Sequence, residues 1–169
     1  VTQIRKYFPN SKIVLSTWRN SNLENLDFDH KVENDDPGDK IYLFKNKKQL
    51  NNVNRMIISS YKGLLSSTTK FSVKLRSDMY FQSNNLIELF NILDNSESNY
   101  ARKKIIIPSN MATNPDRKNK LLFHPSDSFF AGLTHDLLDL FNIPLMNYDE
   151  MRYFDNMEEN SLNIIPKYT

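Results

Sequence analysis

One segment, residues 51–81, limits the possible folds more than any other part of the chain. Its apolar side chains first recur at helical spacing over residues 56–64, and Gly63 lies close to the end of that pattern. Apolar and polar residues then alternate over 71–76, as they do in a half-buried strand. A helix that leads into a strand is the repeating unit of α/β proteins, so this segment predicts that class.

The rest of the chain continues the alternation of helices and strands. We expect further helices over residues 1–8, 84–93 and 135–141. Asn84 or Asn85 is the expected N-cap of the second, and Thr134 that of the third. Further strands are expected over residues 12–18, 28–32, 104–108 and 121–124. This order predicts an α/β fold with a largely parallel sheet, in one domain over residues 1–169.

The composition is that of a folded globular protein, with 39% apolar and 25% charged residues. A net charge of +2 gives no reason to expect a nucleic-acid partner. The absence of cysteine excludes a thiolate metal site and a cysteine nucleophile. No apolar run approaches the ~18 residues of a membrane span. The chain opens on Val1 instead of Met and stops at Thr169, so we expect a fragment of a longer protein.

A charged group follows the strand predicted over 71–75. Lys74 and Arg76 are cationic, and Asp78 comes two residues later. In open α/β sheets ligands bind beyond the carboxyl ends of strands, so these charges predict a site for an anionic or polyhydroxylated ligand. Arg76 is suited to bidentate binding of phosphate, and Asp78 to a metal ion or a ribose. The alternative is an Arg–Asp pair on the surface.

Other candidate ligand residues lie near the ends of predicted elements. Asn54 and Arg55 occupy the first turn of the helix in the 51–81 segment, where anions are favoured. Asp36 belongs to a turn that continues through Pro37 and Gly38. Ser16, Thr17 and Trp18 end the strand predicted over 12–18, and the Trp18 ring can stack on a base. For each group a purely structural role is the alternative.

Two acidic residues are candidates for a catalytic base. Asp127 lies beside Phe129 and Phe130, and an apolar setting raises the pKa of a carboxyl group. Asp136 lies near the start of the helix predicted over 135–141, where the helix dipole favours a carboxylate whether or not it is catalytic. We do not expect a metal site at His124 and His135 alone. The chain has no Walker loop, dinucleotide-binding motif or nucleophile elbow.

Several segments, in this order, resemble the WavE lipopolysaccharide synthesis family. They are IRKYFPNSKIVLSTW, NDDPGD, NVNRMIISSYKGLL, KLRSDMYF and HPSDSFFAGLTHDLLDLF. The resemblance implies a GT-A-like, Rossmann-like three-layer domain that lacks its first strand and its C-terminal region. It also implies a bacterial glycosyltransferase, with Arg76 in place of the first residue of an acidic pair that would hold Mn or Mg.

The resemblance further implies the substrates and the setting of the reaction. The donor would be a nucleotide sugar, and the acceptor a lipid-linked or growing lipopolysaccharide or capsule glycan. Such work takes place at the cytoplasmic face of the inner membrane, which the basic patch of Lys45, Lys47 and Lys48 is suited to contact. The alternatives are a non-catalytic nucleotide- or sugar-binding module and a phosphate-handling hydrolase.

Overall fold

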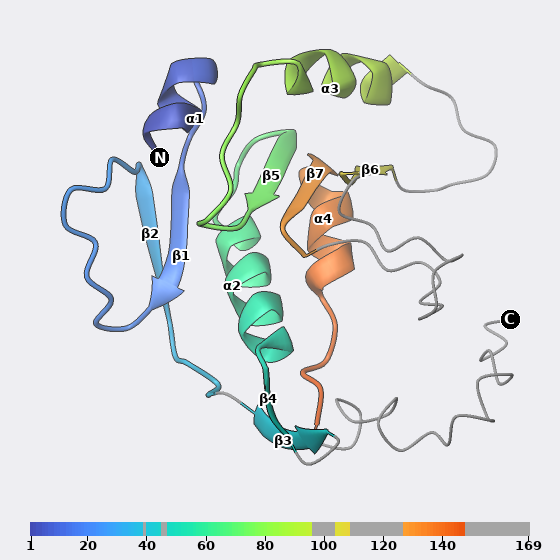
Figure 1. The fold of residues 1–169 in the computed structure, drawn as a ribbon. Helices are drawn as coiled ribbons and strands as arrows, with labels where there is room; N and C mark the ends of the chain where they lie inside the picture. Colours follow the sequence, from blue (N-terminus) through green and yellow to red (C-terminus); the bar gives the residue numbers. More distant parts are fainter. Residues whose placement is uncertain (39, 45–46, 96–103, 109–126, 148–169) are drawn as a thin grey trace, which may run out of the picture.

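The computed structural model describes residues 1–169 except 39, 45–46, 96–103, 109–126 and 148–169 (Figure 1). Four helices are described: α1 (Thr2–Tyr7), α2 (Val53–Leu65), α3 (Leu86–Asn95) and α4 (Thr134–Phe141). The strands are β1 (Val14–Trp18), β2 (His30–Asn34), β3 (Lys40–Phe44), β4 (Lys47–Asn51), β5 (Phe71–Leu75), β6 (Ile105–Ile106) and β7 (Phe129–Leu133). The strand predicted over 121–124 and the patch residue Lys45 lie outside the described residues.

The α/β class is confirmed, but the largely parallel sheet is not. Among the described residues the strands form three small sheets, in the orders β1-β2, β3-β4 and β5-β7-β6. Of the described strands, only β1 and β2 pair in parallel, while β3–β4, β5–β7 and β6–β7 are antiparallel. The architecture is therefore α/β with small sheets of mixed direction.

Two of these differences come from strands that the sequence did not predict. The β3–β4 hairpin lies in a stretch to which we assigned only the basic patch of Lys45, Lys47 and Lys48. Strand β7 lies in a stretch with turn-forming residues, including Gly132. An ideal Cβ at Gly132 would lie 2.9 Å from the backbone oxygen of Lys104, because β6 passes close to β7 at this point. Gly132 thus marks a close approach of two strands instead of a turn.

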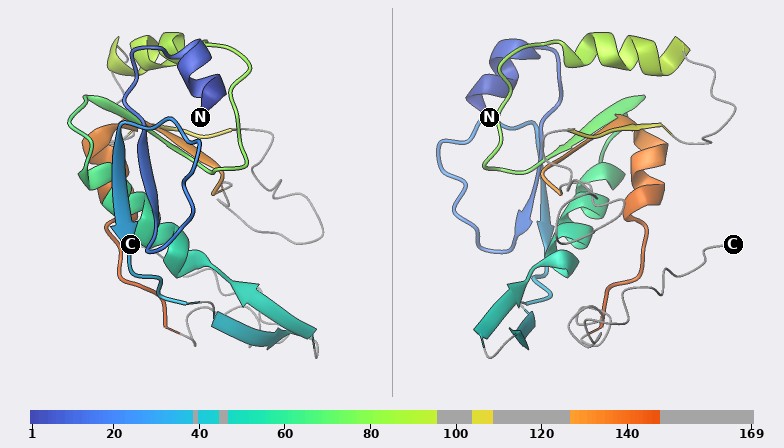
Figure 2. Two further views of the ribbon diagram at one scale, coloured as in Figure 1. Left: turned by 90° about the vertical axis from the view of Figure 1, so that its left-hand side faces the viewer. Right: turned by 45° about the vertical axis from the view of Figure 1, so that its right-hand side comes forward.

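Helix α2 lies against β1 and β2 on one side and α4 on the other (Figures 1 and 2). Its Leu64 joins Phe130, Leu137 and Phe141 in a buried apolar cluster. The rings of Phe130 and Phe141 meet edge to face, with centroids 5.5 Å apart. Toward β1 the helix approaches closely at Gly63, where an ideal Cβ would lie 3.0 Å from the Cβ of Ser16. Gly63 thus lies in the last turn of α2. The sequence had placed it near the end of the helix without deciding whether it lay inside it.

The start of α4 is held to β5 and the loop before it by hydroxyl groups. Thr134 is the first helical residue and not the N-cap that we predicted, because the cap position is Leu133. The Thr134 hydroxyl donates instead to the backbone oxygen of Thr69 (2.6 Å) and lies 2.8 Å from the Ser72 hydroxyl. Because these bonds reach across to another segment, the hydroxyl fixes α4 against β5 instead of capping the helix.

Ion pairs attach α1 to the loop before β2. The Arg5 guanidinium lies 3.0 Å from Asp27 and 3.0 Å from Asp29, and it also donates to the backbone oxygen of Ser11. The Asp29 carboxylate accepts a hydrogen bond from the backbone N–H of Ile13 (2.6 Å). That bond, followed by the bond from Arg5, lowers the pKa of Asp29. The N-terminal helix is thereby joined to the β1–β2 pair.

Gly132→Ala tests the close approach of β6 and β7. The new methyl group would meet backbone, which has no rotamer to relieve the contact. We expect a loss of about 1–3 kcal/mol in the free energy of unfolding, measured from urea denaturation. A variant as stable as the parent protein would show that the two strands do not approach this closely.

Candidate functional site

Arg76 lies directly after β5 and binds two carboxylates at once. Its Nε and Nη2 donate to the two carboxylate oxygens of Asp78, at 2.7 Å each, and its Nη1 donates to Asp127 at 3.3 Å. The Arg76 backbone N–H donates to the buried Ser128 (2.9 Å), and its carbonyl accepts from Met79 (2.9 Å). We call Lys74, Arg76, Asp78 and Asp127 the Arg76 cluster.

The β5–β7 register explains why Asp127 belongs to this cluster. Leu75 pairs with Phe129, so the residues that precede β7 lie beside the residues that follow β5. The sequence brought Arg76 and Asp78 together by their spacing alone, and the structure confirms that the two are in contact. It gave no sign that Asp127, 51 residues away from Arg76, would join them. Only the prediction of β7 would have revealed that contact.

The cluster combines solvent access with balanced charge. The side chains of Arg76, Asp78 and Asp127 are 47%, 60% and 50% exposed. The hydrogen bonds that Arg76 donates to Asp78 lower the pKa of Asp78 and raise the pKa of Arg76. Two cations face two carboxylates, so an incoming anion competes with these carboxylates for Arg76.

Lys74 is the more buried of the two cations in this cluster. Its ammonium donates to the backbone oxygen of Asp127 and lies 5.9 Å from the centre of the Phe130 ring. Burial lowers the pKa of Lys74. Lys74 thus supplies a second, less solvated cation behind the exposed Arg76.

The Arg76 cluster contains two carboxylates, those of Asp78 and Asp127, and Arg76 binds both. In the part of the chain that the structure describes, no three His, Cys, Asp or Glu side chains gather as a metal site would require. Asp78, the predicted metal ligand, gives both carboxylate oxygens to Arg76. The arginine therefore stands where a cation bound between Asp78 and Asp127 would stand.

A second ion pair lies at the start of α2. Arg55 binds both carboxylate oxygens of Asp36, at 2.7 and 2.5 Å, and also donates to the Asn52 side chain (3.2 Å). Asp36 in turn accepts from the backbone N–H of Gly38 (2.9 Å). The bond from Arg55 lowers the pKa of Asp36. The structure thus joins two predicted ligand residues, Asp36 and Arg55, that the sequence had considered separately.

Asn54 is used inside the fold. It is 6% exposed, its Nδ2 donates to the backbone oxygen of Met146 (2.9 Å), and its Oδ1 accepts from the Met146 N–H (2.8 Å). This pair of bonds holds the segment after α4 against the N-terminus of α2. The position that we predicted to face a ligand therefore fixes backbone from 92 residues away.

At the end of β1, Ser16 and Thr17 are bound by a residue that the sequence did not suggest. Asn34 is 5% exposed, and its Nδ2 donates to the Ser16 hydroxyl and the Thr17 carbonyl, both at 3.0 Å. The Thr17 hydroxyl donates to Ser21 (2.9 Å), and Trp18 is half-buried. The sequence held one signal for Asn34: it is a polar residue at an inward position of the strand segment KVEN, and buried polar residues form hydrogen bonds.

The two predicted catalytic carboxylates lie apart. Asp127 precedes β7 and belongs to the Arg76 cluster, while Asp136 follows β7 and lies in the first turn of α4. The Asp136 residue is 3% exposed, and one carboxylate oxygen lies 3.2 Å from Nε2 of His135. The structure therefore brings Asp127, and not Asp136, next to the predicted phosphate-binding residues.

A family model described as WavE lipopolysaccharide synthesis matches residues 1–166. The chain belongs to the WavE lipopolysaccharide synthesis family. This WavE chain is thereby connected with lipopolysaccharide synthesis, as the resemblance implied. No curated protein and no solved structure matches it. None of the helices described for it has the length and apolar character that crossing a membrane requires.

Asn54→Ala tests the attachment of the segment after α4. Removing the amide leaves the Met146 backbone groups without these two partners, so we expect a loss of about 1–3 kcal/mol in the free energy of unfolding. Hydrogen exchange at the Met146 amide should accelerate. Asn10→Ala is the control, because Asn10 is exposed in the turn after α1. Equal effects of the two substitutions would contradict a specific role for Asn54.

Proposed function

We propose that the chain is a glycosyltransferase domain that moves a sugar from a nucleotide-sugar donor to a lipopolysaccharide or capsule glycan. Family membership supports the pathway. The Arg76 cluster at the carboxyl end of β5 supports the donor site, and it is the observation on which the proposal depends. The order of α2, carrying Asn54 and Arg55, and β5, ending before Arg76, supports a GT-A-like reading of this part of the chain.

In this proposal Arg76 neutralises the leaving group. A donor diphosphate displaces a carboxylate oxygen from the exposed guanidinium, and bidentate binding compensates for the lost ion pair. Lys74 adds a second positive charge close by. As the bond between the anomeric carbon and the phosphate oxygen breaks, the negative charge that develops on the diphosphate is held by these cations. Mn or Mg bound at Asp78 is the alternative, and its test is donor turnover with and without added metal.

Asp127 is the proposed base of an inverting reaction. The acceptor oxygen forms its bond to the anomeric carbon while its proton passes to the Asp127 carboxylate. Asp127 is half-exposed and lies beside Arg76, whereas Asp136 is buried beyond the other end of β7. We therefore assign Asp136 to the stability of α4, since a carboxylate in the first helical turn is favoured by the dipole.

Trp18, Asp36 and Arg55 are the proposed contacts for the nucleoside. Trp18 is half-buried at the end of β1, and an indole ring is suited to stacking on a base. Asp36 and Arg55 form a preorganised ion pair of about one-third exposure. We propose that this WavE chain acts in the cytoplasm, at the inner face of the membrane.

A non-catalytic nucleotide- or sugar-binding module is the second candidate. The observation that favours it is that both carboxylates of the Arg76 cluster are already bound to arginine. Turnover of a nucleotide sugar by the intact protein separates the two candidates. Asp78→Ala should abolish transfer in an enzyme, because Asp78 orients the guanidinium.

Arg76→Ala tests the donor site directly. Charged hydrogen bonds contribute about 1.5–3 kcal/mol, so we expect nucleoside diphosphate to bind about 10- to 100-fold more weakly. Thermal stabilisation of the intact protein by a panel of nucleoside diphosphates measures this effect. Lys70→Ala, which removes an exposed cation before β5, is the matched control. Unchanged binding by the Arg76 variant would exclude the cluster as the diphosphate site.

Asp127→Asn tests the assignment of the base. We expect kcat to fall about 10²- to 10⁴-fold while the KM for the donor changes little, because a general base acts in the transition state. Asp136→Asn should instead lower the melting temperature. If Asp136→Asn abolished turnover without loss of stability, the assignment of Asp127 as the base and Asp136 as a structural residue would be wrong.

A further inference from the structure

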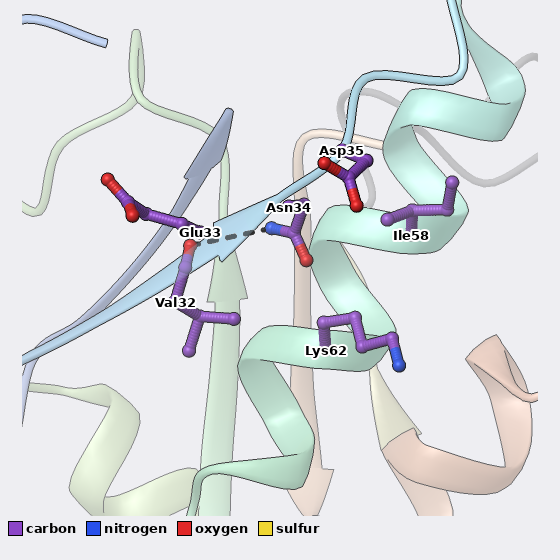
Figure 3. A pocket seen from close by; sticks show the side chains of 6 residues that line it. All are labelled: Val32, Glu33, Asn34, Asp35, Ile58 and Lys62. Atoms are coloured by element: carbon purple, nitrogen blue, oxygen red, sulfur yellow. Dashed lines mark hydrogen bonds between the residues drawn. The ribbon is translucent and has the colours of Figure 1, made fainter. Parts of the chain in front are cut away.

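A hollow of ≈ 360 Å³ lies between β2 and α2, away from the Arg76 cluster. It is lined by Val32, Glu33, Asn34, Asp35, Ile58 and Lys62 (Figure 3), and we call it the β2–α2 hollow. Its volume lies at the lower end of the range for small-molecule sites. None of the functions proposed above uses it.

Asn34 provides a fixed polar group in the hollow. Its Nδ2 is held by Ser16 and Thr17, so the amide cannot rotate freely. Figure 3 shows its side-chain oxygen on the side that faces α2. Since a buried amide oxygen is a hydrogen-bond acceptor in a defined direction, the hollow has one preorganised acceptor.

The charged residues differ in how they are paired. Glu33 binds Lys31 at 3.0 Å, and Asp35 binds Arg19. The side chain of Glu33 points away from Lys62, whereas Asp35 lies over Ile58 (Figure 3). In the described part of the chain the Lys62 ammonium has no ion-pair partner within 4.0 Å. Lys62 is therefore a free donor at the edge of the hollow.

This combination fits a sugar ring better than other small molecules. Hydroxyl groups both donate and accept, so they can satisfy the Asn34 oxygen, the Asp35 carboxylate and the Lys62 ammonium together. The half-buried side chains of Val32 and Ile58 offer an apolar surface to the C–H face of the ring. An anion that reached Lys62 would also lie beside the Asp35 carboxylate, and an apolar ligand would leave the polar groups without partners.

We propose that the β2–α2 hollow binds one sugar residue of the acceptor glycan. Its role as an acceptor site rests on the proposed transferase function, while sugar binding itself rests on the lining groups. Asp35, which lines the hollow, directly precedes Asp36, which Arg55 binds at the start of α2 and which we propose as a nucleoside contact. A ribose has the same chemistry, so the nucleoside of the donor is the alternative source of the ring.

The test uses saturation-transfer NMR on the intact protein. The probes are a delipidated lipopolysaccharide core oligosaccharide, a panel of free hexoses and uridine. The variants are Lys62→Met and Asp35→Asn, and Lys12→Met is the control because Lys12 is exposed before β1. We expect the dissociation constant for the oligosaccharide to rise about tenfold in both variants and to stay constant in the control.

Parallel measurements keep the two proposals distinct. Lys62→Met should leave stabilisation by nucleoside diphosphate intact, and Arg76→Ala should leave oligosaccharide binding intact. If neither the parent protein nor any variant bound nucleoside diphosphate, but all still bound the oligosaccharide, the donor-site proposal would be contradicted and the sugar-binding proposal would stand. No saturation of any sugar, unchanged binding by Lys62→Met, or competition by uridine would overturn the acceptor assignment.

Discussion

The antiparallel pairing of β5 with β7 is the interaction on which the rest of the structure depends. It places Phe130 in the cluster with Leu64, Leu137 and Phe141, so that α2 and α4 share one core. The same pairing brings residues 127 and 128 beside Arg76. Core and charged site thus depend on the same strand pair, in which Lys74 is paired with Phe130, and a shift in register would disturb both.

The sequence predicted those elements whose periodicity is strong and local. Helix α2 and strand β5 were found within three residues of their bounds because their apolar spacing is regular. Strand β7 was missed because Gly132, which resembles a turn residue in the sequence, serves a tertiary contact with β6. The direction of pairing was also missed, since nothing in the spacing of one strand reveals which neighbour it will have.

The same limit applies to the candidate site. Arg76 and Asp78 are two residues apart, so their contact was predictable, whereas the contact with Asp127 depends on β7. Asn54 was placed in the right turn of α2, but its burial against Met146 follows from a segment 92 residues away. The sequence therefore predicted which residues carry the charged and polar groups of the site, but not the distant residues that these groups contact.

Arg55 and Asn54, consecutive on α2, hold two separate stretches of chain. Arg55 retains the 36–38 turn through a salt bridge accessible to solvent, and Asn54 retains Met146 through shielded amide bonds. Polyanions or high ionic strength compete for the first tether and not for the second. Two adjacent residues of α2 therefore anchor the 36–38 turn through a contact that salt weakens and Met146 through contacts that salt leaves unchanged.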